Sequence, residues 1–132
     1  MNTHESYVSL EVAKLLKQAE FDWEIESYYN DGFFYPHDLT DFITLNYNAL
    51  KHANAIYSAP TLAVAHKWLR EVKNIFLYPI PVHVDKKWNW RYWYIDVRDK
   101  DNTEQRYSVL NYITYESALE AGIKKCLELR LK

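Results

Sequence analysis

The sequence predicts an α+β fold in which helices pack on one face of an antiparallel β-meander. Three segments repeat apolar residues at helical spacing, and alternating segments separated by turn signals predict strands. Residues 61–131 read α-β-β-β-α, and residues 1–60 add a helix followed by one or two strands. We expect the 132 residues to form a single domain.

Each predicted helix begins after a hydroxyl residue that can accept a hydrogen bond from the first turn. These N-cap residues are Ser9, Thr61 and Thr114. Each cap is accompanied by a stripe of apolar residues that repeat with the period of a helix. The stripes are Val8, Val12, Leu15, Leu16 and Ala19; then Ala65, Trp68, Leu69 and Val72 within residues 62–74; and last Leu119, Gly122, Ile123, Cys126 and Leu127.

The first predicted strand covers residues 22–29, where Trp23, Ile25 and Ser27 alternate with acidic residues. The sequence NDGF at 30–33 is a turn signal, and residues 33–35 would begin the returning strand. Between Leu39 and Tyr57 the pattern fits a helix or a strand, and both remain open.

The meander is predicted from residues 75–84, 88–97 and 105–112, with turns at 85–87 and 99–102. Pro79 and Pro81 fall on the same face of the first of these strands. Because proline cannot donate to a ladder, that strand either lies at a sheet edge or is broken in two.

The composition excludes several functional classes. The two glycines are too few for a glycine-rich phosphate loop, and the single cysteine, Cys126, cannot form an internal disulfide. The N-terminus has no signal-peptide pattern, and no apolar run approaches the length of a membrane span. We therefore expect a cytoplasmic protein with no membrane partner.

Charge divides the chain into an acidic and a basic half. Residues 1–60 carry three lysines and nine carboxylates, a net of −6, whereas residues 61–132 carry thirteen Lys/Arg and nine carboxylates, a net of +4. The two halves could pack beside each other, which we favour, or form an electrostatic patch for a partner.

Three blocks carry a resemblance to a known family: YVSLEVAKLL, SAPTLAVAHKWLREVKNI and TYESALEAGIKKCLEL. Together they resemble short proteins from gut bacteria and their phages and prophages. The resemblance implies a small accessory protein and carries no activity, cofactor or catalytic residue over to this chain. The long segment 36–57 departs from the shorter members of that family.

Residues that could carry catalysis or bind a metal are sparse. The histidines, His4, His37, His52, His66 and His83, lack metal-ligand spacing, and His66 is predicted to face solvent. Cys126 lies within an apolar stripe, which favours a core cysteine over a nucleophile. Asp22, Glu24 and Glu26 share a strand face and could support acid–base chemistry, although a solvated face is the simpler interpretation. We expect no cofactor and no metal, and a non-enzymatic role is favoured over carboxylate-based catalysis.

The sequence WNWRYWYIDV at 88–97 supplies the candidate binding residues. Strand alternation places Trp88, Trp90, Tyr92 and Tyr94 on one side, with Lys86, Lys87 and Arg91 near the start of the row. The opposite set, which ends in Trp93, Ile95 and Val97, is predicted to face the core. The first row would then be covered by the same chain, form an oligomer interface, or stack on a ligand.

These patterns favour a non-enzymatic binding protein that self-associates as a homo-oligomer or binds a host or phage protein. The alternative is a nucleic-acid or nucleotide binder that uses residues 88–94. The order α-β-β-β-α invites comparison with double-stranded-RNA-binding domains, but the last helix begins TYESALEAG and lacks the lysines that meet phosphates there.

Overall fold

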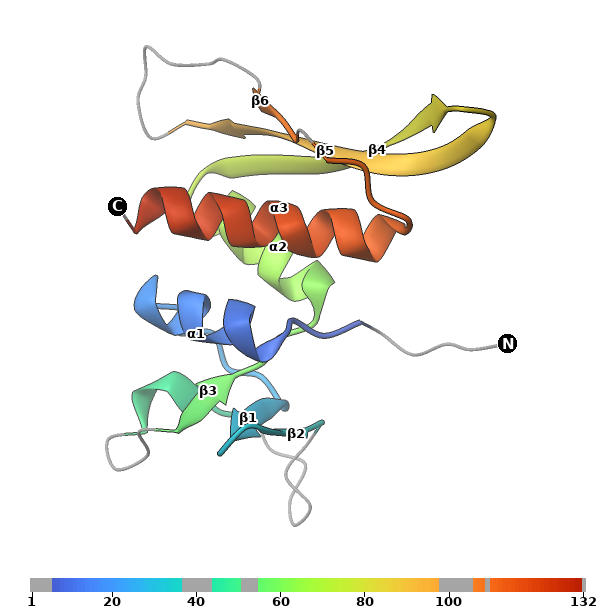
Figure 1. Cartoon of the computed structure of the whole chain (residues 1–132). Coiled ribbons are helices and arrows are strands. Elements are labelled where there is room, and N and C mark those ends of the chain that lie inside the picture. Colours follow the sequence, from blue (N-terminus) through green and yellow to red (C-terminus); the bar gives the residue numbers. More distant parts are fainter. Residues whose placement is uncertain (1–5, 37–43, 51–54, 98–105, 109, 132) are drawn as a thin grey trace. The chain divides into compact units, whose positions relative to one another are not determined.

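The computed structural model describes residues 6–36, 44–50, 55–97, 106–108 and 110–131. It confirms the α+β class, since the described residues form three α-helices and two three-stranded antiparallel sheets (Figure 1). The chain divides into two compact units, an N-terminal unit ending at Thr61 and a C-terminal unit from Leu62 to Arg130. This boundary coincides with the change from acidic to basic sequence.

The N-terminal unit contains one α-helix and a small sheet. Helix α1 (Leu10–Gln18) begins at the predicted cap, where Ser9 Oγ accepts a hydrogen bond from the Val12 amide at 3.3 Å. The sheet has the order β2-β1-β3. Its strands are β1 (Tyr28–Asn30), β2 (Phe33–Tyr35) and β3 (Ile56–Ser58).

The predicted turn between β1 and β2 is confirmed. Asp31 and Gly32 have φ values of 52° and 84°, the positive angles that a two-residue hairpin turn of type I′ requires. The strand predicted over residues 22–29 is shorter than expected, because only its end belongs to β1 and Ile25 forms an isolated bridge with Leu45.

Part of the ambiguous segment 39–57 is described. It contains the 3-10 helix η1 (Tyr47–Ala49) and the start of β3, so it contributes a third strand that the sequence left undecided. Residues 37–43 and 51–54 lie outside the described part of the chain.

The C-terminal unit has the predicted order α-β-β-β-α. Its elements are α2 (Leu62–Val72), β4 (Ile75–Val84), β5 (Lys87–Asp96), β6 (Arg106–Tyr107) and α3 (Tyr115–Arg130). Figure 1 shows both helices on one face of the sheet, whose order is β4-β5-β6. Strand β6 is shorter than predicted, although Tyr112 continues the pairing through a bridge to Trp90. The turn expected at 99–102 lies outside the described residues.

The two prolines of β4 lie on the free edge of the sheet, as predicted for an edge strand. Pro79 faces Tyr92 and Pro81 faces Trp90 across the β4–β5 pair. The backbone groups of Tyr92 and Trp90 bond instead toward β6, to the Ser108 amide at 2.8 Å and to Tyr112 at 2.7 Å. The missing N–H groups of the prolines would therefore have pointed away from β5, so they cost no ladder bond.

Helix α3 packs closely on the sheet. The predicted stripe, including Gly122 and Cys126, is buried as a whole. Cys126 is buried, as expected of a core cysteine. This burial raises the pKa of its thiol to about 12. At Gly122 a Cβ atom would lie 2.5 Å from Leu77 Cδ1 and 3.1 Å from Tyr92 Cγ. Glycine is therefore needed here for the close approach of helix and sheet.

Candidate functional site

Trp88, Trp90, Tyr92 and Tyr94 share one face of β5, and α3 packs against the second half of that row. Tyr92 and Tyr94 are buried, with 6% and 7% of their surface exposed. Trp90 is half-buried and packs edge-on against Tyr115 at the start of α3, with ring centroids 5.4 Å apart. Only Trp88 is well exposed, at 69%. Of the three alternatives for this row, cover by the same chain therefore holds for Tyr92 and Tyr94, whereas Trp88 stays accessible.

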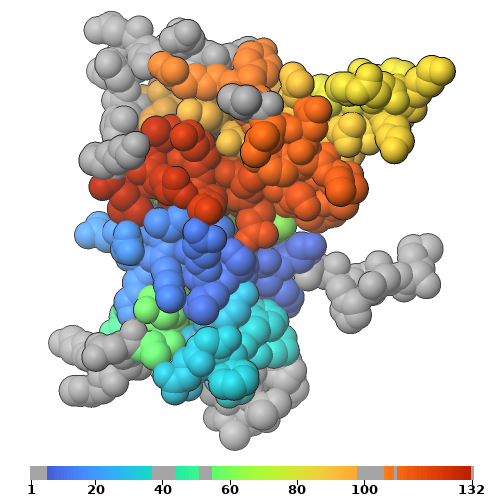
Figure 2. Space-filling model, viewed as in Figure 1, coloured from blue at the N-terminus to red at the C-terminus, as the bar shows by residue number. Residues whose placement is uncertain are grey.

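The exposure of Trp88 follows from the length of the hairpin. The tip of the β4–β5 hairpin, drawn in yellow, projects beyond the start of α3 (Figure 2). Trp88 lies in this projecting part and contacts His83, with ring centroids 4.9 Å apart. Lys86 occupies the hairpin turn with a φ of 65° and is exposed.

Burial changes the acidity of the two tyrosines under α3. Desolvation raises the pKa of the Tyr92 hydroxyl to about 12, and nearby Tyr112 and Cys126 contribute in the same direction. Desolvation likewise raises the pKa of Tyr94. These side chains belong to the core of the C-terminal unit and do not form a ligand surface.

The residues predicted to face the core lie on the opposite side of the sheet. Trp93, Ile95 and Val97 are each partly exposed, and none is buried. The prediction was wrong because α2 and α3 cover the sheet face that carries Ile75 and Leu77. On β5 that face carries the residues that alternate with Trp93 and Ile95, such as Tyr94, the register partner of Leu77.

We call the sheet surface that faces away from α2 and α3 the outer sheet face. It is made of Phe76, Tyr78, Ile80 and Val82 of β4, Lys87, Asn89, Arg91, Trp93 and Ile95 of β5, and Tyr107 of β6. None of these side chains is buried, whereas Ile75, Leu77, Tyr92 and Tyr94 on the other face are. The sheet therefore has one packed face and one accessible face.

An aromatic row crosses all three strands of the outer sheet face. Tyr78 and Trp93 are register partners whose ring centroids lie 4.8 Å apart at an interplanar angle of 36°. Trp93 is in turn the register partner of Tyr107. Tyr78 is 41% and Tyr107 58% exposed, so the two ends of the row are open to solvent.

The charge on the outer sheet face is positive. Lys87 and Arg91 share the strand face of Trp93, and Arg91 Nε donates to the side chain of Asn111. Asp96 is the one carboxylate in the described parts of β4, β5 and β6. Because side chains alternate along a strand, Asp96 lies on the face opposite Ile95. There Arg130 donates from Nε to Asp96 Oδ2 at 2.9 Å and from Nη2 to Asp96 Oδ1 at 2.6 Å.

The predicted acid–base candidates belong to the N-terminal unit. Asp22, Glu24 and Glu26 are all exposed. Among the residues that the structure describes, no cluster of histidine, cysteine and carboxylate side chains could hold a metal ion. His66 does not face solvent as predicted, because its half-buried ring contacts the Leu77 carbonyl through Nε2.

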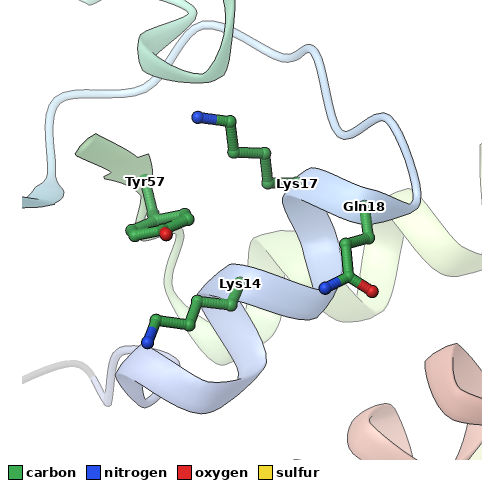
Figure 3. A pocket seen from close by; sticks show the side chains of 4 residues that line it. All are labelled: Lys14, Lys17, Gln18 and Tyr57. Carbon is green, nitrogen blue, oxygen red and sulfur yellow. The ribbon is translucent and has the colours of Figure 1, made fainter. Parts of the chain in front are cut away.

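Sequence reasoning missed a cavity in the N-terminal unit. It is lined by Lys14, Lys17 and Gln18 of α1 and by Tyr57 of β3, and its volume is about 340 Å³ (Figure 3). Lys17 Nζ donates to the Ile56 carbonyl at 3.3 Å across a separation of 39 residues. No local motif links α1 to β3, so the spacing of these residues gave no signal.

Comparison with known proteins assigns no family. No family model matches the chain, and neither a curated protein nor a solved structure is significantly similar to it. In the described part of the chain, no helix combines the length and apolarity needed to cross a bilayer.

Proposed function

We propose that this protein is a non-enzymatic accessory protein of a phage, prophage or gut bacterium that binds single-stranded nucleic acid on the outer sheet face. The observation that carries the proposal is the row of Tyr78, Trp93 and Tyr107 on the face that the helices leave accessible. Bases stack on such rings regardless of sequence, and each stacked base contributes roughly 1–3 kcal/mol.

Charge supports a nucleic-acid partner. Arg91 and Lys87 lie two and six residues before Trp93 on the same strand face, where they can contact backbone phosphates. The basic half of the sequence, with its net charge of +4, corresponds to the C-terminal unit that carries this face.

A single strand suits the surface better than a duplex. Aromatic stacking requires bases that are not already paired and stacked. The N-terminal turns of α3 carry Glu116 and Glu120 and have no lysine before Lys124, so that helix start offers no cation to duplex phosphates.

The test is fluorescence anisotropy with a labelled single-stranded oligonucleotide of about ten nucleotides at low salt. Trp93→Ala removes the centre of the row and is expected to weaken binding about tenfold or more, the loss of roughly one stacked base. The matched control is Trp88→Ala, which removes an exposed tryptophan from the other side of β5 and should leave affinity unchanged.

The salt dependence provides an independent measurement. Arg91→Ala is expected to make the slope of log affinity against log salt shallower by about 0.7, the value for one lost phosphate contact on a single strand. If neither DNA nor RNA changes the anisotropy at low salt, the proposal is wrong.

Self-association through the same face is the second candidate. Phe76, Ile80, Val82 and Ile95 surround the aromatic row with partly exposed apolar surface that stacking alone does not require. Two such sheets could pack face to face about 10 Å apart, as in a β-sandwich. Native mass spectrometry should then show a homo-oligomer that Trp93→Ala dissociates, while oligonucleotide leaves the oligomer unchanged.

A further inference from the structure

The β4–β5 hairpin leaves part of its helix-facing surface uncovered. Figure 1 shows the hairpin extending past the start of α3, and in Figure 2 its yellow tip overhangs that start. We call the surface left open there the inner arm face; it consists of Pro81 and His83 of β4, Trp88 and Trp90 of β5, and Tyr115 of α3. Because side chains alternate along a strand, the strand residues of this surface lie opposite the outer sheet face, and the surface does not depend on the function proposed for that face.

The aromatic rings of the inner arm face are exposed but held by their neighbours. Trp88 is 69% and Tyr115 40% exposed, and Trp90 is half-buried. The His83 ring lies beside Trp88 with centroids 4.9 Å apart, and Tyr115 meets Trp90 edge-on at 5.4 Å. These contacts restrict the rotamers of the rings before a partner arrives, which lowers the entropic cost of binding.

The extent of the face indicates a short partner segment instead of a second copy of the chain. Trp88, its largest member, exposes about 170 Å² of the roughly 250 Å² that a tryptophan can bury. With the smaller side chains added, the face offers roughly a few hundred Å², which is the size of a functional surface patch. A stable interface needs about 800 Å² on each partner, whereas a peptide of several residues can cover this face.

The prolines of β4 prevent a peptide from adding to the sheet as a further strand. Tyr92 and Trp90 bond toward β6, so the backbone groups of their register partners Pro79 and Pro81 point to the free edge. Neither proline has an N–H to donate there, and the carbonyl of Leu77 already contacts His66. A peptide must therefore be held by the side chains of the inner arm face.

We propose that the inner arm face binds a proline-rich segment of a partner protein, with an arginine beside the prolines. A polyproline II chain has no internal hydrogen bonds, so its carbonyls can accept from the indole N–H groups of Trp88 and Trp90. Within the described residues, neither indole N–H has an acceptor. The two tryptophans are two residues apart on β5, about 7 Å, and a chain rising about 3.1 Å per residue spans the rings with about four to six residues.

Charge places the arginine at the α3 end of the segment. Glu116 follows Tyr115, is exposed, and has no ion-pair partner in the described part of the chain. Because helical side chains tilt toward the N-terminus, Glu116 is directed toward the end that the hairpin overhangs. At the hairpin turn, the opposite charges of Asp85 and Lys86 cancel, so Glu116 supplies the charge that selects a basic residue.

The test is fluorescence anisotropy of a labelled peptide of about eight prolines followed by one arginine, titrated with the full chain. Trp88→Ala is expected to weaken binding about tenfold, because it removes the most exposed ring and one donor. Glu116→Gln should remove a preference of about threefold for this peptide over one that ends in glutamine.

Matched controls separate the inner arm face from the rest of the surface. Trp93→Ala removes a tryptophan from the other side of β5, and Glu128→Gln removes an exposed carboxylate near the far end of α3; both should bind the peptide like the unmodified protein. Circular dichroism should show that every variant is folded.

Four results would overturn the proposal. These are no binding up to about 1 mM protein, equal binding of a peptide with alanines in place of the prolines, an equal loss in Trp93→Ala, and a dimer in native mass spectrometry that Trp88→Ala dissociates. The last result would show that a second copy covers the face. An unchanged preference for arginine in Glu116→Gln would overturn the assignment of the basic residue.

Discussion

Replacing Gly122 with alanine should destabilise the C-terminal unit, although alanine is the better helix former. A Cβ atom at this position would meet Leu77 Cδ1 at 2.5 Å, and both Leu77 Cδ2 and Tyr92 Cγ at 3.1 Å. Leu77 is 1% exposed and Tyr92 is buried with it, so neither side chain has solvent to move into.

The expected magnitude is the difference between two opposing effects. Overpacking a core typically costs about 1–3 kcal/mol. Alanine in place of glycine within a helix gains about 1 kcal/mol. Because the closest contact is far shorter than ordinary van der Waals distance, we place the packing cost in the upper part of its range. The free energy of unfolding should therefore fall by about 1–2 kcal/mol.

Urea unfolding followed by tryptophan fluorescence is a suitable assay, since four of the five tryptophans lie in the C-terminal unit. The variant Leu77→Ala supplies a double-mutant cycle, because it removes the side chain that the new Cβ meets. In that background Gly122→Ala should cost much less or become stabilising. If Gly122→Ala alone raises stability by the full helix-propensity gain, the packing argument is refuted.

Three further predictions concern the same unit. Arg130→Lys should lower stability by about 1–2 kcal/mol in urea unfolding, because lysine cannot keep the two-point contact with Asp96 and the bond to the Lys73 carbonyl at 2.6 Å. Burial, aided by Arg70, lowers the pKa of His66 below 6.5 despite an opposing backbone hydrogen bond. Its contribution to stability should be complete above pH 6.5 and lost as pH falls through the lower folded-state value, and His66→Gln should flatten that dependence in melts across the window. Cys126 should react with a thiol reagent at neutral pH only as the protein unfolds, so immediate reaction of the native protein would contradict its burial.

Local sequence patterns predicted much of the secondary structure. Ser9 and Thr114 cap α1 and α3 as expected, and Thr114 Oγ1 accepts the Ser117 amide at 3.0 Å. The bounds of β4 match the prediction, and the turn between β4 and β5 falls at Asp85 and Lys86, both with positive φ. These features depend on neighbouring residues, so a short window of sequence contains the information that fixes them.

The candidate site was harder to predict, because strand alternation sorts residues into two sets without saying which set is covered. Trp93 and Tyr92 are equally compatible with burial when β5 is considered alone. Tyr92 is buried and Trp93 is not, because α3 packs against the Tyr92 side of the sheet. Gly122 leaves room there for Leu77 and Tyr92. That contact joins residues far apart in the chain, so the alternation of residues within β5 alone cannot predict it.

The sequence by itself therefore determined the α+β class and the element order of the C-terminal unit, and it restricted β4 to a sheet edge or a strand broken in two. Those properties follow from period, capping and the chemistry of proline, all of which act within a few residues. The tertiary structure decided which face of the sheet carries an accessible aromatic row, and it brought Lys14 and Lys17 to Tyr57. Both outcomes depend on contacts between distant segments, whose free energy comes from packing and charge placement in the folded chain.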